Sequence, residues 1–136
     1  MPDFTFKKEE RLKSRKILSL LFSKGSSFSA FPLRVVWTPI LRPQSDAPAQ
    51  MALSVPKKKF NKAAHRNLLR RRIREAYRLN KHFLYEDIAD CRHQYGFMFI
   101  YVAKETLPYE KIERAMTSIL KRLSKELNKV DATISD

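Results

Sequence analysis

The segment from Lys57 to Lys81 constrains this chain more than any other part of it. It holds eleven lysines and arginines against a single acid, Glu75, so ten of the fourteen net positive charges lie in 25 of the 136 residues. No Gly or Pro occurs from Asn61 to Phe83, and Asn61 can cap a helix. We therefore predict one long helix from Asn61 to about Phe83. A charge concentrated on one element mainly attracts phosphate.

The cations of this helix gather on one surface when residues are placed at 100° steps. The opposite stripe, which we expect to pack on a sheet, consists of Leu69, Ile73, Ala76, Asn80 and Phe83. The outer residues are Asn67, Arg70, Arg71, Arg74, Arg78 and Lys81. Like charges three or four residues apart repel by a few tenths of a kcal/mol per pair, and a merely solvated face would alternate signs. The arrangement indicates a nucleic-acid partner. A membrane-surface helix would expose its apolar stripe, which the core needs here.

The first half of the chain reads as a helix followed by strands. A helix is predicted from Arg11 to Lys24, with Ser14 as a possible N-cap and Gly25 as its stop. From Phe28 the pattern has period two, which is typical of a half-buried strand in which Phe31, Leu33, Val35 and Trp37 share one face. Three prolines favour a long hairpin connection over residues 39–49. Alternation then resumes at Met51, Leu53 and Val55.

The second half supplies a central strand and a last helix. Phe97 to Ala103 is apolar on both faces, which indicates a strand covered on each side. A helix is predicted after Pro108 to about Lys129, with the buried stripe Ile112, Met116, Ile119, Leu120, Leu123 and Leu127. We expect a single α+β domain over residues 1–130 and a disordered tail over 131–136.

Composition argues against several other classes of protein. No stretch reaches the roughly 18 apolar residues of a membrane span, and the N-terminus lacks the apolar region of a signal peptide, so we expect a cytoplasmic protein. The lone Cys91 cannot form an internal disulfide. The acidic cluster Glu86, Asp87 and Asp90 is more typical of a polar turn than of a metal site. Neither the three histidines nor Cys91 has zinc-ligand spacing, so we expect no catalytic or metal-binding residue in the protein.

The order of residues in the basic helix is specific. Residues 63–75, AAHRNLLRRRIRE, resemble the signature helix of the bacterial ribonuclease P protein subunit. Arg66 and Asn67 match the start of that motif, Arg70 and Arg71 its basic pair, and Arg74 its end. The resemblance extends to the Phe-rich start before residues 11–12, to residues 22–25 and to residues 53–58. Two positions depart from the family: Leu68 replaces the usual second arginine, and the loop over residues 57–61 is one residue longer.

The resemblance implies both a fold and a function. The fold would be an α-β-β(-β)-α-β-α two-layer sandwich with a mixed sheet and a left-handed βαβ crossover. The function would be that of the protein subunit of an RNA enzyme, whose RNA subunit uses Mg²⁺ to remove the 5′ leader of precursor tRNA. The expected partners are the ribonuclease P RNA and precursor tRNA, with no membrane and no DNA. The protein would be a monomer in the holoenzyme and would hold no cofactor of its own.

The resemblance also implies three groups of site residues. The RNA subunit would be bound by Arg66, Asn67, Arg70, Arg71, Arg74 and Arg78. Phosphates near the leader would be met by Lys57, Lys58, Lys59 and Lys62. A leader cleft would be formed by Leu18 and Phe22 of the first helix and by Val36 or Trp37 of the sheet. The alternative for the aromatic residues is a place in the core, because Phe22, Phe31 and Trp37 also have core spacing.

Two other functions fit the charge. A structural RNA-binding protein of the ribosomal type would use the same surface without stimulating cleavage. A DNA-binding regulator would place the basic helix in a major groove. Against the regulator, the cations that fill this face leave few side chains to read bases, and no second helix is positioned to form a helix-turn-helix.

Overall fold

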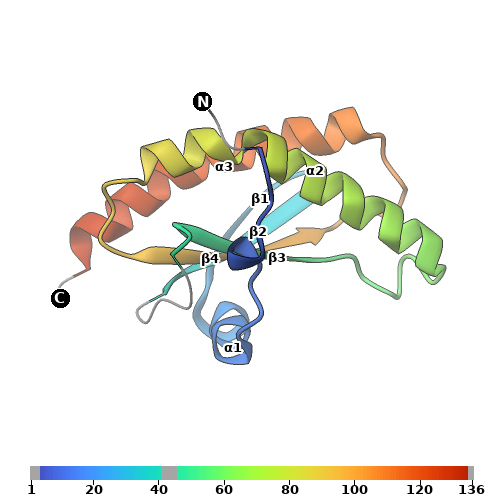
Figure 1. The fold of residues 1–136 in the computed structure, drawn as a ribbon. Coiled ribbons are helices and arrows are strands. Elements are labelled where there is room, and N and C mark those ends of the chain that lie inside the picture. Colours follow the sequence, from blue (N-terminus) through green and yellow to red (C-terminus); the bar gives the residue numbers. More distant parts are fainter. Residues whose placement is uncertain (1–3, 41–45, 135–136) are drawn as a thin grey trace.

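The computed structural model describes residues 4–40 and 46–134. In chain order the elements are η1 (Lys8–Glu10), α1 (Arg15–Lys24), β1 (Ser26–Ala30), β2 (Leu33–Ile40), β3 (Ala49–Ser54), α2 (Ala63–Asp87), β4 (Gln94–Tyr101) and α3 (Tyr109–Thr133). Figure 1 shows α2 and α3 on one face of the sheet and α1 on the other. The predicted α+β sandwich with a mixed sheet is confirmed, and α1 adds partial cover on the second face.

The strand order is β1-β2-β4-β3. β1 pairs with β2 and β2 with β4, both antiparallel, whereas β3 and β4 are parallel neighbours joined by α2. The predicted hairpin between β2 and β3 is therefore wrong, because β4 inserts between them. Only about two-thirds of consecutive strands are neighbours, and a strand that is apolar on both faces belongs in the middle of the sheet.

The stretch predicted as one strand from Phe28 is a hairpin of β1 and β2 that turns at Phe31 and Pro32. Pro39, which was expected to end the strand, lies within β2 opposite Tyr95. The pairing of β1 with β2 extends only to Trp37, so the missing N–H of Pro39 removes no ladder hydrogen bond on that side. Part of the proline-rich connection, residues 41–45, lies outside the described residues.

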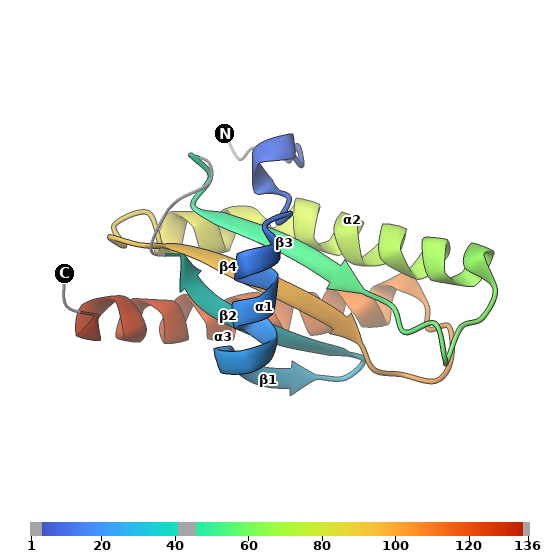
Figure 2. The same ribbon diagram turned by 90° about the horizontal axis from the view of Figure 1, so that it is seen from below.

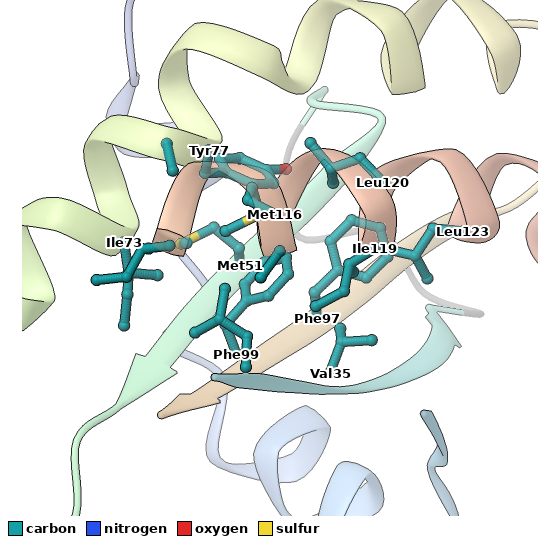
Figure 3. Close-up of a cluster of buried hydrophobic side chains, with 14 of the residues drawn as sticks. Val35, Met51, Ile73, Tyr77, Phe97, Phe99, Met116, Ile119, Leu120 and Leu123 are labelled. Atoms are coloured by element: carbon teal, nitrogen blue, oxygen red, sulfur yellow. The ribbon is translucent and has the colours of Figure 1, made fainter. Parts of the chain in front are cut away.

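The main core lies between the sheet and the α2/α3 layer. Figure 3 shows side chains from the strands meeting side chains from both helices, and the labelled residues are Val35, Met51, Ile73, Tyr77, Phe97, Phe99, Met116, Ile119, Leu120 and Leu123. The predicted apolar stripe of α3 is fully buried here, which confirms that prediction. A second, smaller core under α1 contains Leu12, Ile17, Leu21, Val36, Ile40 and Met98.

α1 begins at Arg15 because the Ser14 Oγ accepts a hydrogen bond from the Ile17 N–H at 3.3 Å, as predicted for an N-cap. Gly25 follows the helix in a tight space. A Cβ on Gly25 would lie 2.5 Å from both the Leu21 carbonyl oxygen and the Val36 Cγ1. The close packing of α1 on β2 therefore depends on a residue without a side chain.

The N-terminal segment, residues 4–14, covers part of the edge of the sheet at β3. The Leu12 N–H donates to the Met51 carbonyl at 2.9 Å, and Arg11 forms an isolated parallel bridge with Met51. The Gln50 Nε2 donates to the Glu9 carbonyl at 3.0 Å. Because the N-terminal segment occupies these groups of β3, less of the edge of the strand is open to pairing with another chain.

α2 differs from its predicted boundaries. It starts at Ala63 after Lys62, without a side-chain cap, so the prediction that Asn61 caps it is wrong. It also continues one turn beyond Phe83, to Asp87. Its buried face includes Tyr77, Lys81 and Leu84, whereas Phe83 is 60% exposed. The buried sector is displaced because α2 packs against α3 and the N-terminal segment as well as the sheet.

α3 also ends later than predicted, at Thr133 rather than near Lys129. The Asp131 carboxylate accepts hydrogen bonds from the backbone N–H groups of Arg92 at 2.9 Å and His93 at 3.1 Å. The Tyr95 hydroxyl donates to the same carboxylate at 3.1 Å. These bonds fix the last turn of α3 to the start of β4. Ser135 and Asp136, the end of the predicted tail, lie outside the described residues.

Within residues 4–40 and 46–134, no helix has the length and apolar character that crossing a membrane requires.

Candidate nucleic-acid interface

The exposed cations of α2 form the centre of the candidate interface. Arg71 and Arg74 are exposed on successive turns. Arg70 is half-buried, and its Nη1 donates to the Oδ1 of the exposed Asn67 at 3.4 Å. These four residues were all predicted as part of the RNA-binding surface. Their side chains project from one side of α2, and none of them is among the buried residues of the helix.

Arg66 links α2 to the loop before it, residues 57–62, which we call the lysine loop. Its Nη1 donates to the Phe60 carbonyl at 2.7 Å, and the Phe60 ring is buried in the main core. The loop is thus held against the start of the helix. A guanidinium has five N–H donors, so one bond to Phe60 leaves capacity for a phosphate.

The lysine loop presents its charges at the end of the sheet. Lys57, Lys58 and Lys62 are exposed. The Lys59 Nζ donates to the Val102 carbonyl at 3.0 Å, just beyond β4. Lys59 therefore attaches the loop to the sheet, while its neighbours face solvent.

Arg78 has protein partners. Its guanidinium pairs with Glu75 and donates to the Phe4 carbonyl, the latter at 2.8 Å. Arg72, which was not assigned a role, donates to the Leu107 carbonyl at 2.6 Å. Both side chains fix neighbouring segments to α2, so their geometry indicates a structural contribution beside any contact with RNA.

Lys81 does not belong to the cationic surface, and its predicted place there is wrong. Its side chain is 2% exposed, and its Nζ lies 2.5 and 2.6 Å from the two carboxylate oxygens of Glu10. It also donates to the Thr5 carbonyl and lies 5.3 Å from the centre of the Tyr85 ring. The ammonium group of Lys81 therefore holds the N-terminal segment against α2.

A hollow of about 340 Å³ extends the cationic surface toward β3. Its polar lining comes from Arg11, Lys13 and Arg74, and its apolar lining from Phe6, Leu12, Met51, Ala52 and Leu53. Sequence reasoning missed Arg11 and Lys13, because no local pattern places residue 11 beside residue 74. Within the sequence, the only signal was the Arg11-Leu12 pair that contributed to the resemblance.

The four residues predicted for a leader cleft divide between the two faces of the sheet. Val36 lies under α1, and Leu18 packs against the same cluster. Phe22, near the end of α1, is 70% exposed. Trp37 lies in the main core on the opposite face, at 6.5 Å between ring centres from Tyr95. Val36 thus lies on the same face of the sheet as α1, with its side chain buried, and Trp37 lies on the other face; the leader cleft itself stays a prediction.

Glu86, Asp87 and Asp90 are exposed at and just after the end of α2. Among the residues that the structure describes, no group of three or more His, Cys, Asp or Glu side chains is placed to hold a metal ion.

The fold and its charged surface define a class: a small basic α+β domain with a helical crossover between two parallel strands, in which ten of the fourteen net positive charges lie in residues 57–81, that is, in the loop before the crossover helix and in most of that helix. The sequence model of a family described as Ribonuclease P matches residues 6–124. The chain is 39% identical over 124 residues to the "Ribonuclease P protein component" of Porphyromonas gingivalis, which covers 90% of this chain and 89% of that relative. This chain belongs to the ribonuclease P protein family.

Solved structures agree on the fold. The structure matches the ribonuclease P protein from Thermotoga maritima with a TM-score of 0.63 and 24% identity, covering 83% of this chain and 96% of that one. It matches the Staphylococcus aureus protein with a TM-score of 0.62 and 20% identity, covering 83% and 94%.

Proposed function

We propose that this chain is the protein subunit of ribonuclease P, which binds the catalytic RNA and the 5′ leader of precursor tRNA and so promotes endonucleolytic removal of the leader. The observation that carries the proposal is the set of exposed cations on α2, in a chain that belongs to this family. The protein acts in the cytoplasm as one copy per holoenzyme. A net charge of +14 supports the single copy, because it opposes self-association at low salt.

The RNA subunit binds along α2. Asn67, Arg70, Arg71 and Arg74 make the main contacts, with Arg66 and Arg78 contributing the donors that their protein partners leave over. Guanidinium groups suit this role because they contact phosphate oxygens with two parallel hydrogen bonds. Lys57, Lys58, Lys59 and Lys62 add phosphate contacts near the leader, with Lys59 limited by its bond to Val102.

The leader lies on the α1 face of the sheet. Phe22 offers an exposed ring and Leu18 a half-buried apolar surface beside it. Aromatic side chains bind single strands of any sequence because every base has a π-face.

The proposal assigns the hydrolysis and its magnesium to the RNA subunit. Metal-dependent protein nucleases bring carboxylates together around the ion. In the described residues, Glu86, Asp87 and Asp90 do not form a group that could hold a metal ion, and the proposal gives them no part in the hydrolysis.

The test combines the purified protein with a bacterial ribonuclease P RNA and a precursor tRNA at low magnesium, and measures release of the leader. We expect cleavage that requires the RNA and rises when the protein is added. Binding without stimulation would replace the proposal with a structural RNA-binding role. Cleavage by the protein alone would move the chemistry to the acidic cluster.

A further inference from the structure

Phe31 is the most exposed of the large apolar side chains in the described residues. It lies in the turn between β1 and β2 and is 71% exposed, although its period-two spacing with Leu33 and Val35 predicted a core position. The turn lifts the residue out of the alternation that buries its neighbours. The ring of Phe31 is therefore not part of the hydrophobic core and is available to contact a partner.

The turn lies beside the lysine loop. The Val102 N–H donates to the Pro32 carbonyl at 2.9 Å, and the Val102 carbonyl accepts from the Lys59 Nζ at 3.0 Å. Val102 is thus bonded on one side to the turn and on the other to the loop. Because neighbouring strands lie about 4.8 Å apart, turn and loop are separated by roughly 10 Å. Figure 2 shows both at the same end of the sheet.

An exposed arginine connects this end of the sheet with the α1 face. Arg34 is two residues from Val36 on β2, so the two side chains share the face that α1 covers. Arg34 is exposed, and its Nη2 donates to the Ser27 Oγ at 3.1 Å. Its partner across the strands is Ile100, whose own partner is Ser54, at the start of the path to Lys57.

The surroundings of Phe31 favour RNA over a protein or a membrane. A protein or lipid partner needs a contiguous apolar patch. Here the nearby exposed positions include Ser29, Arg34 and the lysines of the loop, together with Lys104, Glu105 and Thr106 just after Val102, so the surroundings are polar and mostly cationic. A single exposed ring among cations is instead the combination that binds single-stranded nucleic acid, in which the ring stacks on a base and the cations meet phosphates.

We infer that Phe31 is a base-stacking platform for the single-stranded leader, and that Arg34 pairs with an adjacent phosphate. The leader path therefore continues past Leu18 and Phe22 to the β1–β2 turn. This inference rests on the proposed function, because it takes the 5′ leader to be the strand that crosses this face.

The test measures the affinity of the holoenzyme, assembled from the protein and a ribonuclease P RNA, for precursor tRNAs with leaders of increasing length and for leaderless tRNA. The variants are Phe31→Leu, which removes the π-face, and Phe31→Trp, which keeps one. The matched control is Phe83→Leu, an exposed phenylalanine on α2 in the other layer. Calcium replaces magnesium so that binding is measured without cleavage.

We expect Phe31→Leu to weaken binding of long-leader substrate about 5-fold or more, the lower end of base–aromatic stacking, with no change for leaderless tRNA. Phe31→Trp and Phe83→Leu should retain wild-type affinity. Arg34→Gln should reduce the salt slope of long-leader binding by about 0.7, the value for one phosphate contact on a single strand.

The two proposals fail differently. If the wild-type holoenzyme binds long-leader and leaderless tRNA equally, the leader-binding role itself is wrong. If the wild type distinguishes them and Phe31→Leu distinguishes them equally well, only the inference about Phe31 is overturned. A loss in Phe31→Leu that is the same with and without a leader also overturns it, because that effect would be structural.

Discussion

At the scale of single residues, Lys81 and Glu10 connect the N-terminal segment to the helix α2. Their ion pair is buried, and it joins the segment before α1 to the helix that carries the cations. A buried pair contributes little net stability, but removing one partner leaves the other charge buried without compensation. The pair therefore acts mainly by fixing where the N-terminal segment lies.

Lys81→Met should lower the free energy of unfolding by about 3–5 kcal/mol, because Glu10 would remain buried without its cation. Urea denaturation measures the change. The matched control is Arg71→Met on the exposed side of the same helix, which should change stability by less than about 0.5 kcal/mol. Equal midpoints for the two variants would show that the buried Glu10 carboxylate does not need the charge of Lys81.

Sequence reasoning succeeded for residues whose environment is local and failed for those defined by distant partners. The Ser14 cap depends on an N–H three residues away and was predicted correctly. Lys81 was placed on the outer surface because a helical wheel registers its charge but not Glu10, 71 residues earlier. Phe31 shows a second limit, since a turn interrupts the alternation that the prediction extended through it.

At the scale of elements, α2 keeps Arg70, Arg71 and Arg74 away from its buried face, so these three cations can be replaced without unfolding the helix. The triple variant Arg70→Ala, Arg71→Ala and Arg74→Ala keeps helix-forming residues on a side that does not pack in the core. We expect weaker binding of the ribonuclease P RNA and a salt slope smaller by about 2–3, at 0.7–0.9 per phosphate contact. Filter binding over a series of salt concentrations measures both.

The control removes the same charge from α3. Lys121, Lys125 and Lys129 are exposed lysines at four-residue spacing, and replacing them with alanine changes the net charge equally. This variant should keep most of the wild-type affinity and slope. If both triple variants lose the same slope, the RNA responds to overall charge, and α2 is not its binding surface.

The end of α3 should give the protein a pH-dependent contribution to stability. Burial acts to raise the pKa of Asp131, but the hydrogen bonds from Arg92, His93 and Tyr95 outweigh it and lower the pKa below the ordinary value of 3.8. A lowered pKa stabilises the folded state above the unfolded pKa, and this contribution is lost as pH falls through the folded pKa.

Asp131→Asn should therefore be less stable than wild type at neutral pH, and the difference should shrink as the pH drops below about 3.8. Thermal denaturation between neutral and strongly acidic pH measures it. A difference that stays constant over this range would mean that the ionised carboxylate contributes nothing beyond its shape.

The elements themselves were more predictable than their arrangement. The stripe of α3 and the two apolar faces of β4 follow from spacing, because burial repeats with the period of the element. The place of β4 between β2 and β3 does not, since strand order depends on pairing between segments far apart in the chain. The hollow that brings Arg11 and Lys13 to Arg74 was hidden for the same reason.

At the scale of the whole molecule, charge is divided unequally between surfaces. Residues 57–81 carry a net charge of +10, whereas residues 82–136 carry −1. The folded state brings like charges together, and their repulsion lowers its stability. A bound anion reduces this repulsion. Ligands that bind only the folded state stabilise it in proportion to their affinity.

Millimolar sulfate should raise the melting temperature by about 2–6 °C relative to sodium chloride at the same ionic strength, the shift that roughly 1 kcal/mol produces in a domain of this size. Differential scanning fluorimetry measures it. The shift should be smaller in the α2 triple alanine variant than in the α3 control. An equal shift in both variants would mean that sulfate acts by general exclusion from the protein surface.

The bond between Glu10 and Lys81 also sets an order of events during synthesis. Chains emerge from the ribosome at about 5–20 residues per second, so roughly 4–14 seconds pass between these two residues. Until then, the first residues to be made lack the cation that neutralises Glu10, and for the early part of this interval they also lack the Met51 carbonyl that pairs with Leu12. The first segment of the chain therefore cannot reach its final position when it is made, and the hollow between this segment and Arg74 forms only after α2 has been translated.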